Sequence, residues 1–229
     1  MTDKTKPLVS IIIPTKNNVV ELAECLETIA KSAFEEIEII IVDGGSTDDT
    51  IEMLDRYSKI ISNYISEPDS GVYDALNKGC MLASGRFYLF LGADDRLLNN
   101  LKDISLQLKD PNTIYYGDVI LQDSNYRYDG KFSVWKLART NICHQAIFYP
   151  ETVFKSYRYN LNYPIQADWE LNMRLWHDPR FVFKYIDFPI TVFGNKGLSS
   201  TKEDKTFNNC YLELIKIYFP RDVYVYRKI

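Results

Sequence analysis

The feature that most constrains the fold of this chain is the regular alternation of apolar runs and amphipathic stretches in its first hundred residues. Continuous apolar runs at 9–13, 37–42 and 87–91 are typical of strands that are buried on both faces. Between the first two runs, Leu22 and Leu26 belong to a pattern with apolar residues three or four positions apart, which predicts a helix. Helices that alternate with strands in this way predict an α/β fold, with a mostly parallel central sheet and helices on both of its faces.

Length and composition fit a single domain. The chain has 229 residues, of which 46% are hydrophobic and 25% are charged, and such a chain can bury a substantial core. No repeat or linker divides it. The net charge of −4 argues against a protein whose main partner is nucleic acid. No apolar run approaches the ~20 residues that span a bilayer, and the first residues lack a signal-peptide core, so we expect a cytoplasmic protein.

Acidic residues directly follow two of the predicted strands. Asp43 comes after the run at 37–42, and Asp94 and Asp95 come shortly after the run at 87–91. The carboxyl ends of parallel strands share one edge of a sheet, where open α/β sheets bind their ligands. Two adjacent carboxylates repel each other, and a divalent cation that also holds a phosphate would relieve the repulsion. The alternative is a simple turn in which one of the two acids caps a helix.

Sequence signatures for direct phosphate binding are absent. The first predicted strand-to-helix turn, PTKNNVVE, lacks the glycines of a dinucleotide-binding fold, and the P-loop pattern GxxxxGK(S/T) occurs nowhere. A diphosphate at this sheet edge would therefore be held through a metal ion rather than by backbone N–H groups. A nucleotidyltransferase is disfavoured for the same reason, because it would need a glycine-rich phosphate loop near the N-terminus.

Residues 8–96 contain four sequence blocks in this order: VSIIIPTKN, IIIVDGGSTDDT, DSGVYDALNKG and FLGADD. Together they resemble the nucleotide-sugar half of family 2 glycosyltransferases of the GT-A fold, of the kind found in bacterial exopolysaccharide, O-antigen and colanic-acid biosynthesis. The resemblance implies one GT-A domain over 1–229, with a nucleotide-sugar half at about 8–96 and an acceptor half with a C-terminal helix at about 97–229. It implies an inverting enzyme that transfers a sugar from a UDP-sugar to a hydroxyl of a glycan or lipid-linked acceptor in a single displacement.

The resemblance assigns nucleotide contacts to specific positions. Asp43 matches the carboxylate that accepts a hydrogen bond from the uracil ring, and an ionised Asp suits this role because it can only accept. Without the resemblance, Asp43 is equally explained as a turn residue before Gly44 and Gly45. Lys78 would reach the phosphates, although a solvated helix residue is an equally good interpretation. The other matched contact positions lie in loops near the base: Pro14, Thr15, Asn17, Asp69 and Gly71.

The resemblance also implies a metal ion, Mn²⁺ or Mg²⁺, at the paired acids. Asp94 and Asp95 match the family's DxD motif, although Gly92 stands where its fullest form carries the first acid. Asp95 would be the principal metal ligand, and Asp94 would face the ribose or the metal. His144 belongs to an HQ pair that recurs before an apolar strand in a bacterial polysaccharide subgroup of the family, which implies a metal ligand beside the donor diphosphate. A histidine with a structural role at the start of that strand is the alternative.

An inverting transfer needs a base that takes the proton of the acceptor hydroxyl. The segment ADWE opens a predicted helix and resembles the family's ED-type motif, so Asp168 is the expected base. Glu170 is the alternative, although its place two residues along the helix turns it away from the same point. Both acids also fit a structural role, since acidic residues favour helix N-termini.

Two further segments carry weaker signals. The loop 194–200 contains two glycines and is expected either to cover the donor or to be an ordinary solvent loop. The segment 221–228 interleaves Arg and Lys with Tyr, which would suit peripheral contact with the cytoplasmic face of an anionic membrane. A packed terminal segment explains the same residues.

Two other function classes remain open. A catalytically weak or inactive nucleotide-sugar-binding protein of the same fold would tolerate the loss of its acids, but Asp43, Asp94, Asp95 and Asp168 are all present. A glycosidase also uses paired carboxylates. Metal-dependent binding of UDP would distinguish a glycosyltransferase from a glycosidase.

Overall fold

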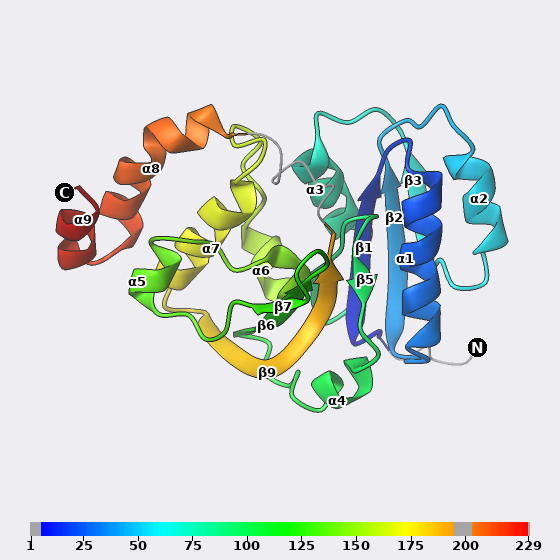
Figure 1. Ribbon diagram of the computed structural model, residues 1–229, viewed down its shortest axis with the longest axis horizontal. Coiled ribbons are helices and arrows are strands. Elements are labelled where there is room, and N and C mark those ends of the chain that lie inside the picture. Colours follow the sequence, from blue (N-terminus) through cyan, green and yellow to red (C-terminus); the bar gives the residue numbers. More distant parts are fainter. Residues whose placement is uncertain (1–5, 195–202, 229) are drawn as a thin grey trace.

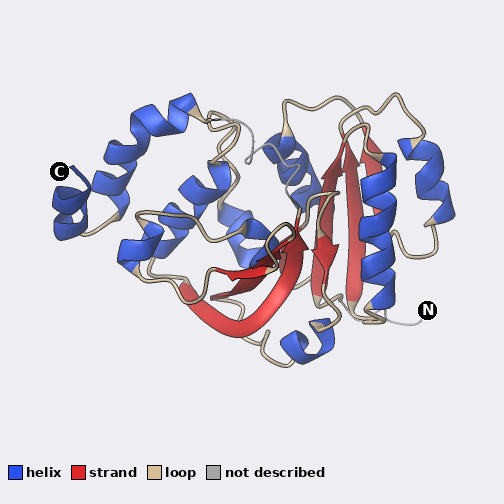
Figure 2. Cartoon of the chain, in the orientation of Figure 1, coloured by secondary structure: helices blue, strands red, loops and turns tan. Residues whose placement is uncertain are grey.

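The structure, a computed structural model, describes residues 6–194 and 203–228. Within these residues the strands form one nine-stranded sheet in the order β3-β2-β1-β4-β8-β6-β9-β5, with β7 beside β6. The sheet curls, and helices lie on both sides of it (Figure 1, Figure 2). The N-terminal and C-terminal halves of the chain meet where β4 pairs with β8.

The N-terminal half alternates strands and helices as predicted. It contains β1 (Val9–Thr15), α1 (Val19–Lys31), β2 (Ile37–Asp43), α2 (Thr50–Arg56), β3 (Asn63–Ser66), α3 (Val72–Leu82) and β4 (Phe87–Phe90). Strand β1 pairs in parallel with β2 and β4, and β2 pairs in parallel with β3. The register places Thr15 beside Asp43, so these strands end at one edge of the sheet, as expected.

The continuous apolar runs are explained by burial on both faces of the sheet. Along β1, Ile11 and Ile13 belong to the same core as Leu22 of α1, whereas Ile12 belongs to the core that contains Leu76 of α3. All five side chains are at most 1% exposed. Because burying each such side chain stabilises the fold by about 1.5–3 kcal/mol, the two-sided run fixes α1 and α3 on opposite faces of the sheet (Figure 1).

The C-terminal half is less regular. It contains β5 (Arg96–Leu97), α4 (Leu101–Ser105), β6 (Thr113–Leu121), β7 (Tyr126–Tyr128), α5 (Val134–Leu137), the 3-10 helix η1 (His144–Ala146), β8 (Ile147–Pro150), α6 (Glu151–Ser156), α7 (Ala167–His177), β9 (Val182–Phe193), α8 (Lys205–Tyr218) and α9 (Arg221–Lys228). Strand β8 pairs antiparallel with β4 and β6, whereas β9 runs parallel to β6 and antiparallel to β5. The predicted parallel pairing therefore holds for the first half and for one pair of strands in the second.

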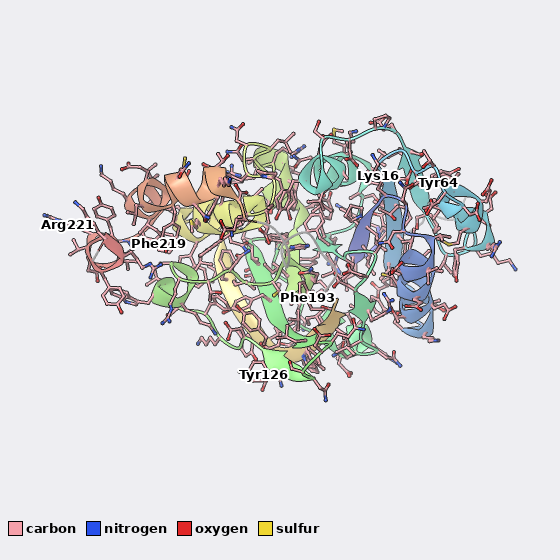
Figure 3. All side chains as sticks on the ribbon, turned by 45° about the horizontal axis from the view of Figure 1, so that its top comes forward. Lys16, Tyr64, Tyr126, Phe193, Phe219 and Arg221 are labelled. Atoms are coloured by element: carbon pink, nitrogen blue, oxygen red, sulfur yellow. The ribbon has the colours of Figure 1, made fainter. Side chains whose placement is uncertain are left out.

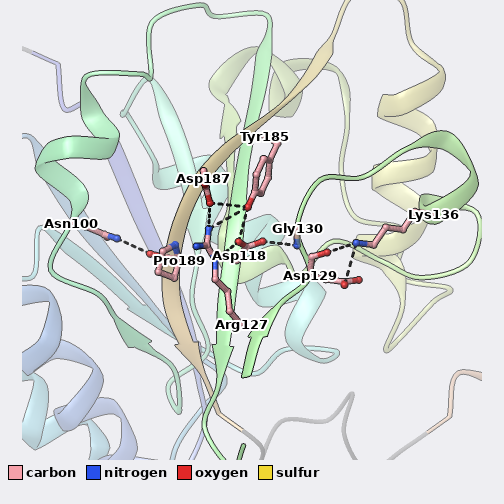
Figure 4. A network of polar contacts seen from close by, with 9 residues as sticks. All are labelled: Asn100, Asp118, Arg127, Asp129, Gly130, Lys136, Tyr185, Asp187 and Pro189. Atoms are coloured by element: carbon pink, nitrogen blue, oxygen red, sulfur yellow. Dashed lines mark hydrogen bonds and ion pairs between the residues drawn. The ribbon is translucent and has the colours of Figure 1, made fainter. Parts of the chain in front are cut away.

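The long strand β9 curves through the second half and brings Phe193 to the middle of the molecule (Figure 1, Figure 3). Its register against β6 shifts around Gly117, where a Cβ atom would lie 2.3 Å from a carbonyl oxygen of β9. Next to this shift, the buried carboxylate of Asp118 accepts hydrogen bonds from Arg127 of β7 and Tyr185 of β9 (Figure 4). This polar network ties three strands together and fixes the course of β9 toward the first half.

Several element boundaries differ from the sequence predictions. The apolar spacing in 99–108 predicts a helix over that whole stretch, but the helix is limited to α4. The segment 126–132 is predicted to be a strand, and the strand ends with β7. The apolar pattern of α1 continues to Ala33, but the helix ends at Lys31, and Ala33 has a left-handed backbone with φ of +48°. The elements β5, α5 and α6 are too short to show an apolar period, so the sequence does not predict them.

The start of α8 is fastened to the loop before α7 by one buried acid. The Asp204 carboxylate accepts a hydrogen bond from the N–H of Phe207, and its other oxygen accepts from the N–H groups of Ile165 and Gln166. Because Asp204 is only 1% exposed, these bonds hold the entrance to α7 in place.

The C-terminal segment 221–228 forms the helix α9, and its Val223 is buried, so this end of the chain is packed. No helix within 6–194 and 203–228 is long and apolar enough to cross a membrane. Apart from Gly194, the glycine-containing loop 194–200 lies outside the described residues.

Candidate functional site

A cavity of about 910 Å³ lies between the two halves of the chain. One side, here called the strand wall, comprises residues 14–18, 69, 71 and 92–94, and the other, the helix wall, comprises 140, 141, 143–145, 164–166, 168 and 169. Eight of the residues that the sequence singled out line this cavity: Pro14, Thr15, Asn17, Asp69, Gly71, Asp94, His144 and Asp168.

The turn after β1 is held by the turn after β2. Asn17, with φ of +50°, accepts a hydrogen bond from the N–H of Thr47 (2.8 Å) and donates its own N–H to Ser46 Oγ (2.7 Å). Asn adopts this left-handed conformation more readily than most residues. The buried hydroxyl of Thr15 has no hydrogen-bond partner among the described residues, and it therefore offers a free polar group to a ligand in the cavity.

Asp43 is fully buried and lies behind the cavity wall rather than on it. One carboxylate oxygen accepts hydrogen bonds from Ser66 Oγ (2.6 Å) and from the N–H groups of Ser46 (2.9 Å) and Gly45 (3.1 Å). Burial acts to raise the pKa of Asp43, but the hydrogen bonds from the two serines and from Gly45 outweigh it and lower the pKa below its usual value. The turn-forming role is thus present in the structure, and the contact with uracil stays a prediction.

Asp69 does reach the cavity, and a glycine allows it to do so. Its carboxylate accepts a hydrogen bond from the N–H of Gly71 (2.9 Å). A Cβ atom on Gly44 would lie 2.4 Å from Asp69 Oδ2, which is too close for any side chain. The Gly-Gly turn after β2 therefore makes room for an acid on the strand wall.

Lys78 lies on α3, outside the cavity wall. Its ammonium group is 2.8 Å from a carboxylate oxygen of Glu67, 2.9 Å from the carbonyl oxygen of Pro68 and 3.6 Å from Asp74. The hydrogen bond with Glu67 raises the pKa of Lys78. The predicted contact with phosphate would require Lys78 to exchange these partners.

The two adjacent acids after β4 have different surroundings. Asp94 lines the cavity, and its Oδ2 atom is buried without a hydrogen-bond partner among the described residues. Asp95 is 1% exposed and accepts hydrogen bonds from the N–H of Gly92 (2.7 Å) and of Gly194 (3.0 Å). Burial raises the pKa of Asp95 to about 6, against the lowering effect of the Gly194 N–H, and the nearby Asp94 charge adds to the rise.

The backbone around these acids is too close for side chains. A Cβ atom on Gly194 would lie 2.5 Å from Asp94 Oδ2, and one on Gly92 would lie 2.8 Å from Asp94 Oδ1. The departure from the fullest metal motif at Gly92 therefore has a local reason, because an acid at that position would collide with the carboxylate that follows it.

Asp94 and Asp95 fit a cation that is completed by a substrate. Asp94 has an unpartnered carboxylate oxygen, and the raised pKa of Asp95 shows that its negative charge is poorly compensated. Mg²⁺ at phosphate sites is commonly held by one or two carboxylates together with the phosphates. Among the described residues, no group of three or more His, Cys, Asp or Glu side chains could hold a metal by itself. Asp94 and Asp95 would therefore hold a divalent cation only together with oxygen atoms of a bound diphosphate.

Asp168 lies in the first turn of α7 and is held by side chains from three other segments. Its Oδ1 atom is 2.8 Å from Tyr73 Oη, and its Oδ2 atom accepts a hydrogen bond from Asn141 Nδ2 (2.9 Å). His144 Nδ1 also lies 3.1 Å from Oδ2. Asp168 is 9% exposed and borders the cavity.

His144 connects Asp168 to the cavity. It lies in η1, immediately before β8, so the single imidazole expected at the entrance of that strand is in a 3-10 turn. Because its Nδ1 atom contacts the carboxylate, Nε2 is the ring atom that remains for a ligand. A carboxylate on one ring nitrogen and a ligand on the other is a common arrangement of metal-binding histidines.

Glu170 points to a different place. It is 4% exposed, does not line the cavity, and forms an ion pair with Arg174 (2.9 Å) one helical turn further along α7. Burial raises the pKa of Glu170, whereas Arg174 lowers it. Of the two acids in the ADWE segment, only Asp168 is therefore in contact with the cavity.

Sequence reasoning missed the partners of Asp168. Tyr73 lies within the DSGVYDALNKG block, so a motif signal was available for it. Asn141 lies three residues before His144 and belongs to no recognised motif. Its role depends on a contact with Asp168, 27 residues away, which no local pattern reveals.

The chain matches known proteins over most of its length. The model of glycosyl transferase family 2 matches residues 10–202. A PGL/p-HBAD biosynthesis glycosyltransferase of Mycobacterium tuberculosis is 39% identical over 211 residues, which cover 88% of this chain and 82% of that protein. Glycosyltransferase GlyG of Streptococcus pneumoniae is 27% identical over 232 residues, covering 96% of this chain and 71% of that protein.

Solved structures share the fold at low sequence identity. The 1–349 portion of S. aureus TarS in complex with UDP is 20% identical with a TM-score of 0.72, and the match covers 92% of this chain and 65% of that one. The mannosyltransferase PcManGT of Pyrobaculum calidifontis, in complex with GDP-Man and Mn²⁺, is 18% identical with a TM-score of 0.68, covering 86% and 59%. The chain thus spans less than two thirds of the length of these two structures.

Proposed function

Since the chain belongs to glycosyltransferase family 2 and has the GT-A fold, we propose that it transfers a sugar from a UDP-sugar to an acceptor hydroxyl. The proposed acceptor is a glycan or a lipid-linked oligosaccharide of bacterial surface polysaccharide or glycolipid biosynthesis. One observation carries the proposal: the same cavity is bordered by Asp94, whose Oδ2 atom has no hydrogen-bond partner among the described residues, and by Asp168 on the opposite wall.

In this proposal the strand wall binds the donor, and His144 contributes from the helix wall. Asp94 would face the ribose or the metal, Asp95 and His144 would hold Mn²⁺ or Mg²⁺, and that cation would supply positive charge beside the leaving diphosphate. Asp43 and Lys78 are proposed to contact uracil and phosphate after exchanging their present partners. The nucleotide is contacted by Pro14, Thr15, Asn17, Asp69 and Gly71.

The choice of donor class has support from the solved structures. TarS was solved with UDP and with UDP-GlcNAc, and PcManGT was solved with GDP-Man and Mn²⁺. A nucleotide sugar and a divalent cation are therefore used within this fold. We propose UDP for this chain because its motifs resemble those of UDP-sugar enzymes.

The helix wall is proposed to perform the proton transfer. Asp168 would take the proton of the acceptor hydroxyl while that oxygen attacks the anomeric carbon opposite the leaving diphosphate, so that one displacement inverts the configuration. Tyr73 and Asn141 contact the two oxygens of the Asp168 carboxylate and hold it at the cavity. Residues 8–96 thus serve as the donor half and 97–229 as the acceptor half of one domain.

For a lipid-linked acceptor, we propose that α5 and α9 contact an anionic membrane surface peripherally. Trp135 and Tyr226 are 44% and 65% exposed, and their rings meet edge to face at 5.7 Å. The exposed cations Lys131 and Arg139 flank α5 in the sequence, and the exposed Lys228 is the last residue of α9. Vesicles of phosphatidylglycerol should bind the protein and those of phosphatidylcholine should not, and equal binding to both would contradict the proposal.

The deciding experiment is a donor panel. UDP-glucose, UDP-galactose, their N-acetyl forms and GDP-mannose are each incubated with the protein and Mn²⁺, and release of nucleoside diphosphate is measured with water as the acceptor. One UDP-sugar should be hydrolysed, and chelation with EDTA should stop the reaction. Binding of UDP without turnover of any donor would favour the alternative, an inactive nucleotide-sugar-binding protein. Metal-independent turnover would contradict the proposed mechanism.

A further inference from the structure

A continuous chain of hydrogen bonds runs from the aromatic core to Asp168. Tyr149 Oη donates to Asn172 Oδ1 (2.8 Å), Asn172 Nδ2 donates to Asn141 Oδ1 (2.9 Å), and Asn141 Nδ2 donates to Asp168 Oδ2 (2.9 Å). Tyr149 and Asn172 are fully buried and do not line the cavity. The chain therefore reaches the helix wall from behind.

The chemistry of each member gives the chain a direction. Burial raises the pKa of Tyr149, so its hydroxyl keeps its proton and donates it. The oxygen end of the Asn172 amide must then face Tyr149, and its NH₂ end must face Asn141. This in turn points the NH₂ group of Asn141 at Asp168. If the Asn141 amide turned over, its oxygen would face the Asp168 carboxylate and repel it, and if the Asn172 amide turned over, its oxygen would face the oxygen of Asn141.

The burial of these groups is not explained by packing. A buried amide pair gains little over an apolar pair of the same shape, because its hydrogen bonds replace bonds to water. Tyr149 also packs its ring against Phe90 and Phe154, and a phenylalanine would make the same ring contacts. What the hydroxyl and the amides add is a fixed donor at the carboxylate.

We propose that Tyr149, Asn172 and Asn141 are positioning residues, which act through one another to hold the Asp168 carboxylate in its orientation toward the cavity. The other oxygen of Asp168 is already fixed by the N–H of Trp169 and by Tyr73, so the contacts of Oδ2 with Asn141 and His144 set the remaining rotation of the carboxylate plane, and the hydrogen-bond chain holds the Asn141 donor. The proposal rests on the proposed role of Asp168 as the base.

The test is a pair of variants that alter the chain at a distance from the cavity. In Tyr149→Phe the first donor is lost, and in the double variant Tyr149→Phe/Asn172→Leu both buried polar partners become apolar, which should leave stability nearly unchanged. Measured as hydrolysis of the donor identified by the panel, kcat should fall about 10-fold in both, and KM for the donor should change less than 2-fold.

Tyr116→Phe is the matched control. Tyr116 is a buried tyrosine whose hydroxyl accepts a hydrogen bond from the N–H of Phe132 (2.9 Å). It belongs neither to the hydrogen-bond chain nor to the cavity wall. The variant Tyr116→Phe should lower the melting temperature without changing kcat. If the double variant keeps wild-type kcat, or if kcat falls only in proportion to the folded fraction measured by circular dichroism, the positioning role is wrong.

A double-mutant cycle tests whether Tyr149 and Asn141 act through one another. Asn141→Ala should lower kcat by itself, and adding Tyr149→Phe to it should lower kcat no further, since the last donor is already gone. Additive losses would contradict the proposal. Asp168→Asn is assayed beside these variants: if it retains full activity, the base assignment has failed, whereas an inactive Asp168→Asn with unaffected chain variants overturns the positioning role alone.

Discussion

The two walls of the cavity are built in different ways. On the strand side, acids accept hydrogen bonds from the backbone of their own turns, as Asp43 does from Gly45 and Asp69 from Gly71. On the helix side, Asp168 is held by Tyr73, 95 residues earlier in the chain, and by Asn141. The acids of the strand side are therefore held mainly by backbone N–H groups, some of them distant in the chain as Gly194 is from Asp95, whereas side chains from other segments hold the acid of the helix wall.

This difference has a consequence for mutation. A change in a turn of the strand wall should act mainly on ligand binding or on stability, because that side carries most of the proposed donor contacts. A change on the helix wall should act on turnover, because several elements converge on the proposed base.

Asp168→Asn should produce the largest change. An amide cannot take the acceptor's proton, so we expect kcat to fall about 10³-fold, within the range for general bases. UDP affinity, measured by calorimetry with Mn²⁺, should stay within about 2-fold of wild type, since the strand wall is intact and the amide oxygen of the variant can still accept a hydrogen bond from His144. If UDP affinity falls together with kcat in this variant, donor binding and proton transfer are not divided between the two walls.

Gly194→Ala should act on the strand wall from the far end of β9. A methyl group would lie 2.5 Å from Asp94 Oδ2 and would disturb the N–H that holds Asp95. Since outer partners of metal ligands are worth about 10–100-fold in metal affinity, Mn²⁺-dependent UDP binding should weaken by that amount. Gly117→Ala is the control. Its added methyl group would collide with the backbone of β9 at the β6 bulge, so this variant should lower the melting temperature and leave the affinity for UDP unchanged.

Asp43→Asn should mainly destabilise the fold. The buried carboxylate accepts three hydrogen bonds on one oxygen, and replacing it by an amide leaves a donor without a partner, which costs about 1–3 kcal/mol at neutral pH. The folded pKa of Asp43 is lowered, so its stabilisation is present above about pH 3.9 and is lost as the pH falls through the folded value. Urea denaturation of variant and wild type should therefore converge in acid.

The pH dependence of metal binding should follow Asp95. Its pKa is raised to about 6, and a cation binds only the deprotonated form, so Mn²⁺-dependent UDP affinity should fall about 10-fold per pH unit below 6. In the metal-free protein the same shift lowers stability as the pH rises from about 4 through 6, because the folded state favours the protonated acid. If UDP affinity in the presence of Mn²⁺ is the same at pH 5 and at pH 7, Asp95 is not a metal ligand.

Lys78→Met should have the smallest effect. The ion pairs of Lys78 with Glu67 and Asp74 lie near the surface and are worth less than about 1 kcal/mol. Because the proposed contact of Lys78 with the phosphates replaces these partners, gain and loss nearly cancel, and UDP affinity should fall by no more than about 3-fold. An unchanged affinity would show that Lys78 keeps its present partners and does not reach the donor.

Sequence reasoning was most successful where a residue's position follows from its own strand. The runs ending at Thr15 and Asp43 predicted parallel strands with a common edge, and the register aligns these two residues. It was least successful for short elements such as α5, whose four residues show no period, and for Ala33, where the apolar pattern outlasts the helix. It ranked Asp168 above Glu170, and only Asp168 lies at the cavity.

By itself, the sequence determined the family, the alternating strands and helices of the first half, and the acids at the strand ends, because periodicity and turns are properties of neighbouring residues. Tertiary structure alone decided that Asp94 keeps a free oxygen while Asp95 is held by Gly92 and Gly194. It also decided that Asn141 points its amide at Asp168. Such contacts join residues far apart in the chain, and their geometry exists only once the sheet has curled and β9 has returned to the first half.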